Sequence, residues 1–289
     1  MASKHALPIV AEEGFKNAAA YDVHRPSYPP EAVDAFLSAL KVANYPESKI
    51  VEVASGTGKF TELLARRPER FLVKAVEPHD GMRGKLVKKD LPGVEVLAGK
   101  AEKMPVDDEW GDACIAAQSF HWFATLEAIA EIERVLRPGA VFGMIWNIED
   151  YNKPVSWVAT TKWERKLSDF ITSFKDGNLR FRDESWKDVF AENLPYTPFQ
   201  VIKNTITDHL PRFSLPLGEG KVSWTVWLSE DALWSRLQTL SQIAVLKGPD
   251  LENAKKIVKD ALSGDDVKRN EKGEIAVHGV TYYAWADRL

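Results

Sequence analysis

A glycine-containing turn between residues 50 and 61 carries the clearest chemical signal in this chain. The apolar run that ends at Val53 predicts a strand, Gly56 and Gly58 allow a sharp turn, and the apolar spacing that starts at Phe60 predicts a helix. Glu77 ends the next apolar run, about twenty residues past the turn, where a carboxylate can accept both hydrogens of a ribose diol. The turn and this acid together predict a site for a nucleoside.

The turn lacks two features of phosphate-binding loops. Thr61 stands where a dinucleotide fingerprint has its third glycine, and Val53 stands where a phosphate-cradling loop has its first. Glu52, on the strand itself, would repel a pyrophosphate, although it can orient loop amides or meet an ammonium group. A nicotinamide dinucleotide therefore fits this turn less well than a nucleoside with a cationic portion.

Composition sets the broad class. The chain has 289 residues and a formal net charge of −4, which gives no electrostatic footprint for nucleic acid or an anionic membrane. Cys114 is the only cysteine and lies in an apolar run, so we expect a buried thiol and no disulfide. The six histidines have no metal-ligand spacing, and no apolar run reaches membrane-spanning length. We expect a soluble cytoplasmic protein without a metal.

Strand-like and helix-like runs alternate through residue 147. Strands are predicted over residues 50–53, 71–76, 94–98, 112–117 and 140–146, with helices over 31–40, 81–89 and 126–136. This alternation favours parallel strands with right-handed crossovers in an α/β fold. Beyond Asp150 the pattern predicts helices over 157–174 and 229–246 and late strands over 199–207 and 274–286, with Ser229 as a helix N-cap.

We expect one domain, because no repeat or low-complexity linker interrupts the chain. Within it, residues 1–48 form an N-terminal lid segment and residues 49–147 form the cofactor-binding core. Residues 148–289 supply substrate-side helices and the last two strands.

Several motifs together resemble class I S-adenosylmethionine-dependent methyltransferases, particularly the small-molecule type 11 group that includes fungal trans-aconitate methyltransferase. The resemblance covers most of the chain. Its motifs are Tyr21…Arg25-Pro26-x-Tyr28-Pro29, Glu52-Val53-Ala54-Ser55-Gly56-Thr57-Gly58, Val76-Glu77-Pro78, Ala101-Glu102-Lys103-Met104-Pro105, Gln118-Ser119-Phe120-His121-Trp122 and Leu136-Arg137-Pro138-Gly139.

The resemblance implies a Rossmann-like seven-stranded sheet, parallel with one reversed strand, with helices on both faces and a partly helical lid. It implies S-adenosylmethionine as the cofactor, bound at the carboxyl ends of the strands. The cofactor site would then comprise Tyr21, Arg25, Glu52, Ala54, Ser55, Gly56, Thr57, Gly58, Glu77, Pro78, Met82, Ala101, Glu102 and Gln118. In this set Glu77 holds the ribose, Pro78 and Met82 flank the adenine, and Arg25 meets the cofactor carboxylate.

Two positions depart from the family pattern. Ala54 replaces a usual glycine, and Lys100 stands where the family often has a small polar or acidic residue that reaches the adenine amino group. A lysine cannot accept that hydrogen bond. We expect Lys100 to point to solvent, with neighbouring backbone groups serving the adenine.

His121 is the candidate catalytic residue, because it closely follows the predicted strand 112–117, with Trp122 beside it. It would act as a base toward a hydroxyl or amine, or orient a carboxylate without taking a proton. The alternative is a structural histidine. Trp122, Trp146 and Tyr283 are the candidate substrate contacts, with core packing as the alternative for the tryptophans. Strand alternation places Tyr283 and Trp285 on one face and Tyr282 on the other.

The predicted function is methyl transfer from S-adenosylmethionine to a small organic acceptor, at oxygen, with a carboxylate as the first choice. The main alternative is a protein that keeps the cofactor fold but transfers no methyl group, either regulatory or catalysing a rearrangement. A nicotinamide-dependent dehydrogenase and a nucleic-acid methyltransferase are less favoured, the first by the turn and the second by charge.

Overall fold

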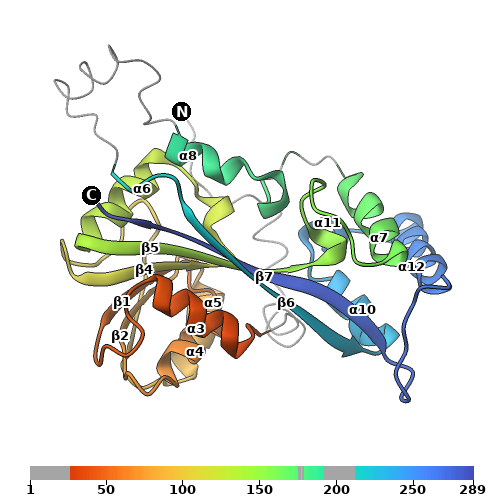
Figure 1. Cartoon of the computed structure of the whole chain (residues 1–289), viewed down its shortest axis with the longest axis horizontal. Helices are drawn as coiled ribbons and strands as arrows, with labels where there is room; N and C mark the ends of the chain where they lie inside the picture. The colour runs from red at the N-terminus through yellow and green to blue at the C-terminus, as the bar shows by residue number, and fades with distance from the viewer. Residues whose placement is uncertain (1–26, 175–176, 178, 192–211) are drawn as a thin grey trace, which may run out of the picture. The chain divides into compact units, whose positions relative to one another are not determined.

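The computed structural model describes residues 27–174, 177, 179–191 and 212–289, which form two compact units (Figure 1). The described part of the core unit comprises residues 30–146, 184–191, 212–221 and 282–289. The described part of the helical unit comprises residues 27–29, 147–174, 177, 179–183 and 222–281. Both units are built from discontinuous stretches, and three strands contribute residues to both. The expectation of a single domain with a lid stays a prediction.

A seven-stranded sheet has the order β3-β2-β1-β4-β5-β7-β6. The strands are β1 (Lys49–Val53), β2 (Leu72–Val76), β3 (Val94–Leu97), β4 (Gly111–Ala117), β5 (Leu136–Glu149), β6 (Gly218–Leu228) and β7 (Ile275–Asp287). Adjacent strands from β3 through β5 pair in parallel, and one strand of the mixed sheet is reversed. The predicted fold class is confirmed. Because β1 and β4 are neighbours, the strand order reverses between them, which places the switch point of the sheet beside the turn after β1.

The sequence located the first four strands and β7 to within one residue at each end, found only the middle of β5, and missed β6. Strand β5 is longer at both ends than the predicted 140–146, because Leu136 already pairs with Gly111 ahead of a bulge. The sixth strand is β6, which was not predicted, although its half-buried and exposed residues alternate along its whole length. The strand predicted over 199–207 lies outside the described residues.

Helices cover both faces of the sheet in the core unit (Figure 1). One face carries α3 (Pro30–Ala39), α4 (Lys59–Ala65) and α5 (Asp80–Lys88), and the other carries α6 (Leu126–Val135) and α8 (Asp188–Ala191). Phe36 of α3 packs edge-on against Phe60 and Tyr283 on the first face. Phe120 packs against Phe142 on the opposite face. Cys114 is fully buried on β4, as predicted, and burial raises the pKa of its thiol.

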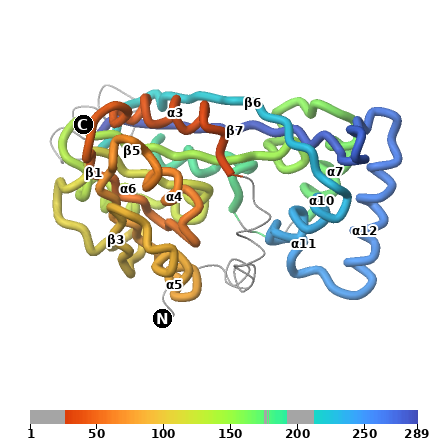
Figure 2. The backbone as a smooth tube through the Cα atoms, turned by 90° about the horizontal axis from the view of Figure 1, so that it is seen from below, coloured from red at the N-terminus to blue at the C-terminus, as the bar shows by residue number. Residues whose placement is uncertain are grey.

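The helical unit contains α7 (Lys162–Thr172), α10 (Glu230–Leu237), α11 (Ser241–Ala244) and α12 (Gly248–Leu262) (Figure 2). Trp163, Leu233 and Val277 belong to one buried apolar cluster of this unit, which is why these helices gather on β7. Ser229 caps α10 as predicted, accepting the Ala232 N–H at 3.1 Å. Helix α7 is shorter than the predicted 157–174 because Thr161 caps it, and the predicted helix 229–246 is two helices; α12 was not predicted.

Four short 3-10 turns complete the described elements: η1 (Phe120–Trp122), η2 (Asp150–Asn152), η3 (Phe181–Asp183) and η4 (Ser185–Lys187). Among the helices in the described ranges, none combines the length and apolar character needed to cross a bilayer.

Candidate cofactor and acceptor site

The turn after β1 has a backbone conformation, with positive φ angles, that glycine adopts far more readily than other residues. Ala54, Gly56 and Gly58 have φ values of 53°, 60° and 84°. The turn is closed by hydrogen bonds from Ser55 N–H to the Val76 carbonyl (3.1 Å) and from Gly58 N–H to the Ser55 carbonyl (3.0 Å). The Ala54 backbone lies in the left-handed region, where a side chain costs about 1 kcal/mol of folding free energy relative to glycine. This cost explains why the family usually has glycine at this position. Thr57 is buried within the turn.

Glu77 closes the turn from the end of β2. Its side chain is 4% exposed; Oε2 accepts the Gly56 N–H and Oε1 accepts the His79 N–H, each at 2.8 Å. Burial raises the pKa of this carboxyl, and the two backbone hydrogen bonds oppose the rise. Each carboxylate oxygen has two lone pairs, so one acceptor position remains on each for a diol. A Cβ at Gly56 would meet only Met82 Sδ, at 3.9 Å, so a ligand can approach this backbone closely. The residues present fit a nucleoside.

Glu52 lies under the same turn and is 1% exposed. Its Oε2 accepts the Thr61 hydroxyl hydrogen at 2.6 Å. Desolvation by burial raises its pKa to about 8, with the neighbouring Glu77 charge adding to the rise and Thr61 and Lys89 opposing it. The side chain is therefore largely protonated at neutral pH. Its hydrogen bond with Thr61 joins β1 to α4, and it presents no exposed charge to a ligand.

The start of α5 supports Glu77 through residues that the sequence analysis did not single out. The His79 ring caps this helix by accepting the Met82 N–H on Nδ1 at 3.2 Å. The Arg83 guanidinium donates to the carbonyls of Glu77 and Pro78 at 3.1 and 3.3 Å. The signal in the sequence was one aspartate, Asp80, in the first turn of the helix, directly after His79 at the N-cap position.

Ala101 and Glu102 occupy the tip of a tight turn. Lys100 and Lys103 exchange two backbone hydrogen bonds, of 3.2 and 3.0 Å, across its base. Ala101 is buried and Glu102 half-buried, whereas Lys100 is exposed, as predicted. A Cβ at Gly99 would lie 2.6 Å from Pro105 Cδ, so the loop folds back tightly on itself.

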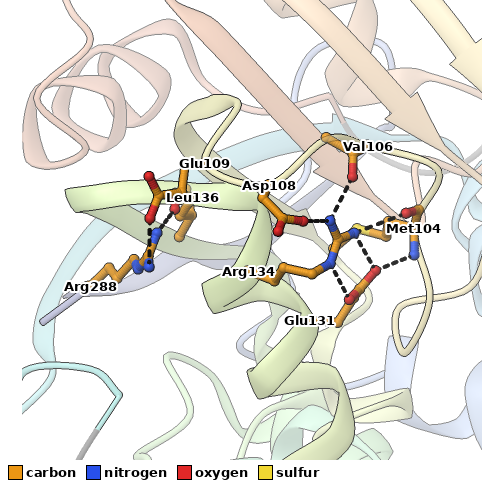
Figure 3. Close-up of polar contacts among 8 residues, drawn as sticks. All are labelled: Met104, Val106, Asp108, Glu109, Glu131, Arg134, Leu136 and Arg288. Carbon is orange, nitrogen blue, oxygen red and sulfur yellow. Dashed lines mark hydrogen bonds and ion pairs between the residues drawn. The ribbon is translucent and has the colours of Figure 1, made fainter.

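The loop that follows this turn is held by one arginine (Figure 3). Arg134 of α6 donates from Nη1 to the Val106 carbonyl (2.8 Å) and Asp108 (2.5 Å), and from Nη2 to the Met104 carbonyl (3.1 Å). Glu131 accepts two further bonds from Arg134, at 2.7 and 2.8 Å, and also the Met104 N–H at 2.6 Å. These bonds lower the pKa of Glu131 and raise that of Arg134. We call Glu131 and Arg134 the α6 clamp.

The segment after β4 brings polar groups to the same edge of the sheet. Gln118 has a φ of 60° and donates its N–H to the Ile145 carbonyl at 2.8 Å. The neighbouring Ser119 is buried, and its Oγ has no hydrogen-bond partner in the part of the chain that the structure describes. Ser119 belongs to one of the family-like motifs but was not predicted as a site residue.

His121 and Trp122 lie in η1, with ring centroids 4.9 Å apart. His121 is half-buried, and its Nδ1 accepts the indole N–H of Trp146 at 3.1 Å. Trp146, at 0% exposure, packs against Trp186 and Tyr282 at centroid distances of 4.8 and 6.0 Å. The structure therefore brings Trp146 to His121 through a hydrogen bond between side chains.

The other predicted contacts lie elsewhere or outside the described residues. Tyr283 is buried against Phe36 and stacks on Trp285 at 5.8 Å, on the face opposite Tyr282, as the strand alternation predicted. Its role as a substrate contact stays a prediction. Tyr21 and Arg25 lie outside the described residues.

Sequence comparisons identify the family. A family model described as a methyltransferase domain matches residues 51–144. An uncharacterized methyltransferase of Schizosaccharomyces pombe is 31% identical over 196 residues, which cover 68% of this chain and 71% of that protein. An uncharacterized methyltransferase of Mycobacterium tuberculosis is 40% identical over 139 residues, 48% of this chain and 53% of that protein. The chain thus spans about half the length of its mycobacterial relatives.

Two more distant relatives have names that state the methylated atom. They are a fatty-acid O-methyltransferase of Mycolicibacterium smegmatis, 27% identical over 48% of each chain, and a malonyl-[acyl-carrier protein] O-methyltransferase of Methylococcus capsulatus, 29% identical over 38% of this chain and 41% of that protein. Among solved structures, a candidate type II methyltransferase from Anaeromyxobacter dehalogenans shares the fold with a TM-score of 0.55 at 20% identity, covering 91% of this chain and 97% of that one. With the fold, the turn and these relatives in agreement, this chain belongs to the methyltransferase family.

Proposed function

We propose that this chain transfers a methyl group from S-adenosylmethionine to an oxygen of a small organic acid. The observation that carries the proposal is the buried Glu77 carboxylate. It is fixed by the Gly56 and His79 amides and keeps acceptor capacity for a ribose diol beside an open glycine backbone.

The cofactor would be held by the chain's own residues in the core unit. Glu77 takes the ribose, the turn from Ala54 to Gly58 lines the methionine portion, and Ala101 and Glu102 lie toward the adenine. S-Adenosylmethionine supplies a methyl group that is already activated on a sulfonium. The protein therefore has to bind, align and exclude water, and it needs a base only where the acceptor arrives protonated.

The choice of oxygen rests on the two relatives named as O-methyltransferases, one of them for a fatty acid. His121 and Trp122 supply a polar and an aromatic group after β4, next to the switch point of the sheet. A carboxylate is the acceptor that needs the fewest groups here, because it is ionised at neutral pH.

Calorimetric titration with S-adenosylmethionine and S-adenosylhomocysteine tests cofactor binding. The wild type should bind both, and Glu77→Ala should weaken binding about 100-fold, because two hydrogen bonds to a buried charged group are lost. Glu95→Ala is the matched control, since Glu95 is an exposed acid on the adjacent strand β3. Circular dichroism must show that both variants fold. No binding by the folded wild type would overturn the proposal.

An acceptor screen then tests transfer. Carboxylic acids, phenols and amines are incubated with methyl-labelled cofactor, and methylated products are identified by mass spectrometry. Methyl esters are the expected products. Tight cofactor binding without any methylated product would instead favour a protein that keeps the fold without transfer.

A further inference from the structure

The Arg83 side chain turns back from α5 onto the segment that follows β2. Its Nη1 donates to the main-chain carbonyls of Glu77 and Pro78, at 3.1 and 3.3 Å. Its Nη2 donates to Asp80 in the first turn of the same helix, and the Arg83 side chain is 23% exposed. Because the guanidinium is planar and rigid, these bonds fix it in one orientation. One side chain therefore holds both carbonyls of the segment that carries Glu77.

The Glu77 carboxyl is fixed as firmly as its main chain. Gly56 and His79 each donate a backbone N–H to one of its oxygens, at 2.8 Å. The His79 ring also caps α5, so the main-chain donor of His79 and the side chain of Arg83 both come from the start of this helix. Because Glu77 has little freedom to move, its capacity to accept hydrogen bonds from a ligand depends on its charge state.

Strand β1 and helix α5 bring titratable groups to Glu77. Burial raises the pKa of Glu77, and its two backbone hydrogen bonds, the His79 ring and the Arg83 charge oppose the rise. Glu52 of β1 adds little negative charge at neutral pH, because burial keeps it largely protonated. The Asp80 side chain is 90% exposed, so water and salt screen its charge. The Arg83 guanidinium is therefore the fixed positive charge that favours the ionised form of Glu77.

We propose that Arg83 is a positioning residue for the cofactor, which holds the Glu77 main chain and keeps the Glu77 carboxyl ionised so that it can accept the ribose hydroxyl hydrogens. This inference rests on the proposed function, in which Glu77 binds the ribose. A protonated carboxyl presents an O–H donor in place of one acceptor position, so cofactor affinity should fall as Glu77 gains a proton. Arg83 acts through Glu77 and moves this fall to lower pH.

Two substitutions of Arg83 separate its charge from its geometry. Arg83→Gln removes the positive charge and keeps an N–H donor, whereas Arg83→Lys keeps the charge and loses the planar fork. Arg66→Gln is the control for net charge, because Arg66 is 73% exposed and pairs with Glu62 at 3.6 Å. Circular dichroism must show that all three variants fold.

An NMR titration of the free protein reads the charge state of Glu77 without any cofactor. In protein labelled with ¹³C at the glutamate carboxyls, the Glu77 signal is assigned by its loss in Glu77→Gln. In Arg83→Gln we expect its titration midpoint to rise by about 1 pH unit, the scale of one nearby opposite charge. Arg83→Lys and Arg66→Gln should stay within about 0.3 pH unit of the wild type.

The titratable ring of His79 needs its own control. Asparagine at position 79 can still cap α5 and does not titrate. The Arg83→Gln comparison is therefore repeated in His79→Asn, where we expect the same rise in the Glu77 midpoint. A rise that disappears in this background would mean that the effect runs through His79, and it would overturn the role of the Arg83 charge.

Calorimetric titration with S-adenosylmethionine at a series of pH values provides the second readout. In Arg83→Gln the pH at which affinity falls to half of its plateau should rise by the same amount as the Glu77 midpoint, about 1 pH unit. In Arg83→Lys the plateau affinity should be about 3- to 10-fold weaker, because the two carbonyl bonds cannot both be kept, with the pH of half-affinity unchanged. Arg66→Gln should match the wild type in both values.

Distinct results would overturn separate parts of the inference. An unchanged Glu77 midpoint in Arg83→Gln, or an equal rise in Arg66→Gln, would overturn the role of the Arg83 charge. Wild-type affinity in Arg83→Lys would overturn the role of its geometry. A shifted Glu77 midpoint in a folded protein that binds no S-adenosylmethionine would overturn the proposed function, while the effect of Arg83 on Glu77 would stand.

Discussion

The two sides of the candidate site are held in place by different kinds of contact. Around the turn after β1, the contacts are backbone amides and buried carboxyls, such as Gly56 to Glu77 and Thr61 to Glu52, and all lie between residues 52 and 86. Around η1 the contacts are aromatic rings that come from residues 120, 146, 186 and 282. We call these the turn side and the aromatic side.

The difference has a physical consequence for how each side responds to change. The turn side depends on φ angles and on the charge state of two acids, so small chemical substitutions there should act strongly. The aromatic side depends on the packing of large rings, where loss of volume matters more than charge. The two sides can therefore be perturbed independently.

The largest expected effect is at Glu52, whose pKa burial raises to about 8. Between the ordinary value of 4.5 and about 8, the unfolded chain ionises this group while the folded protein keeps it protonated, so stability falls as pH rises. The Glu52→Gln side chain cannot ionise, so the stability of this variant does not fall in this way as pH rises. Its amide oxygen can still accept the Thr61 hydroxyl hydrogen. The free energy of unfolding of the variant minus that of the wild type should increase by about 1.4 kcal/mol per pH unit, about 4–5 kcal/mol in all.

Urea unfolding from about pH 5 to pH 9 measures this difference. Glu95→Gln, an exposed acid on β3, is the control and should show a difference that stays flat with pH. A flat curve for Glu52→Gln as well would mean that Glu52 is ionised in the folded protein and that the turn side carries a buried charge.

On the aromatic side, Trp186→Ala should cost about 3–5 kcal/mol of stability, because it empties a fully buried site between Phe120, Trp146 and Tyr282. The expected cost does not depend on pH. Trp227→Ala is the control, since Trp227 is 44% exposed and its loss should cost less than about 1 kcal/mol. Equal losses for the two variants would contradict a packing role specific to the aromatic side.

The same contrast explains what the sequence could predict. The turn side is encoded locally: glycines, an acid at each strand end and a helix start lie within one strand-turn-helix-strand stretch, so spacing alone located Glu77 beside Gly56. The aromatic side is assembled from distant positions. The spacing of His121 and Trp146 in the sequence does not predict a hydrogen bond between them. The alternation along β7 predicts only that Tyr282 and Tyr283 lie on opposite faces of the sheet. The α6 clamp was missed for the same reason, because Arg134 reaches a loop 26–30 residues away.

The late strands show a related limit. Strand β6 has clear alternation, but glycines at 218 and 220 and charges at 219 and 221 resemble a loop. The glycines are used for space, since a Cβ at either position would overlap the rings of Trp285 or Tyr283. Only the tertiary neighbour reveals that purpose.

Gly58→Ala tests the backbone of the turn side. Gly58 has a φ of 84°, and a Cβ there would overlap Leu86 Cδ1, so we expect a loss of about 2–4 kcal/mol from strain and overpacking together. Gly139→Ala separates the two causes, because Gly139 has a φ of 74° with open space around it and should lose only about 1–2 kcal/mol. Chemical denaturation measures both. If the two variants lose the same amount, contact with Leu86 contributes nothing.

The smallest expected effect is at the α6 clamp, which belongs to neither side but fixes the loop beyond Ala101 and Glu102. Arg134→Lys keeps the charge and loses the planar fork, so the bonds to the Met104 and Val106 carbonyls cannot all be kept. We expect a stability loss of about 1–2 kcal/mol and a 3- to 10-fold weaker affinity for S-adenosylmethionine.

Arg137→Lys is the matched control. Arg137 is more exposed than Arg134 and donates to Asp112 at the start of β4, away from the loop that Arg134 holds. Calorimetry should show wild-type affinity for that variant. One outcome is that Arg134→Lys weakens cofactor affinity and leaves acceptor kinetics at saturating cofactor unchanged. That result would mean that the α6 clamp acts on the turn side. A change confined to acceptor KM would instead join it to the aromatic side, since α6 also begins just after η1.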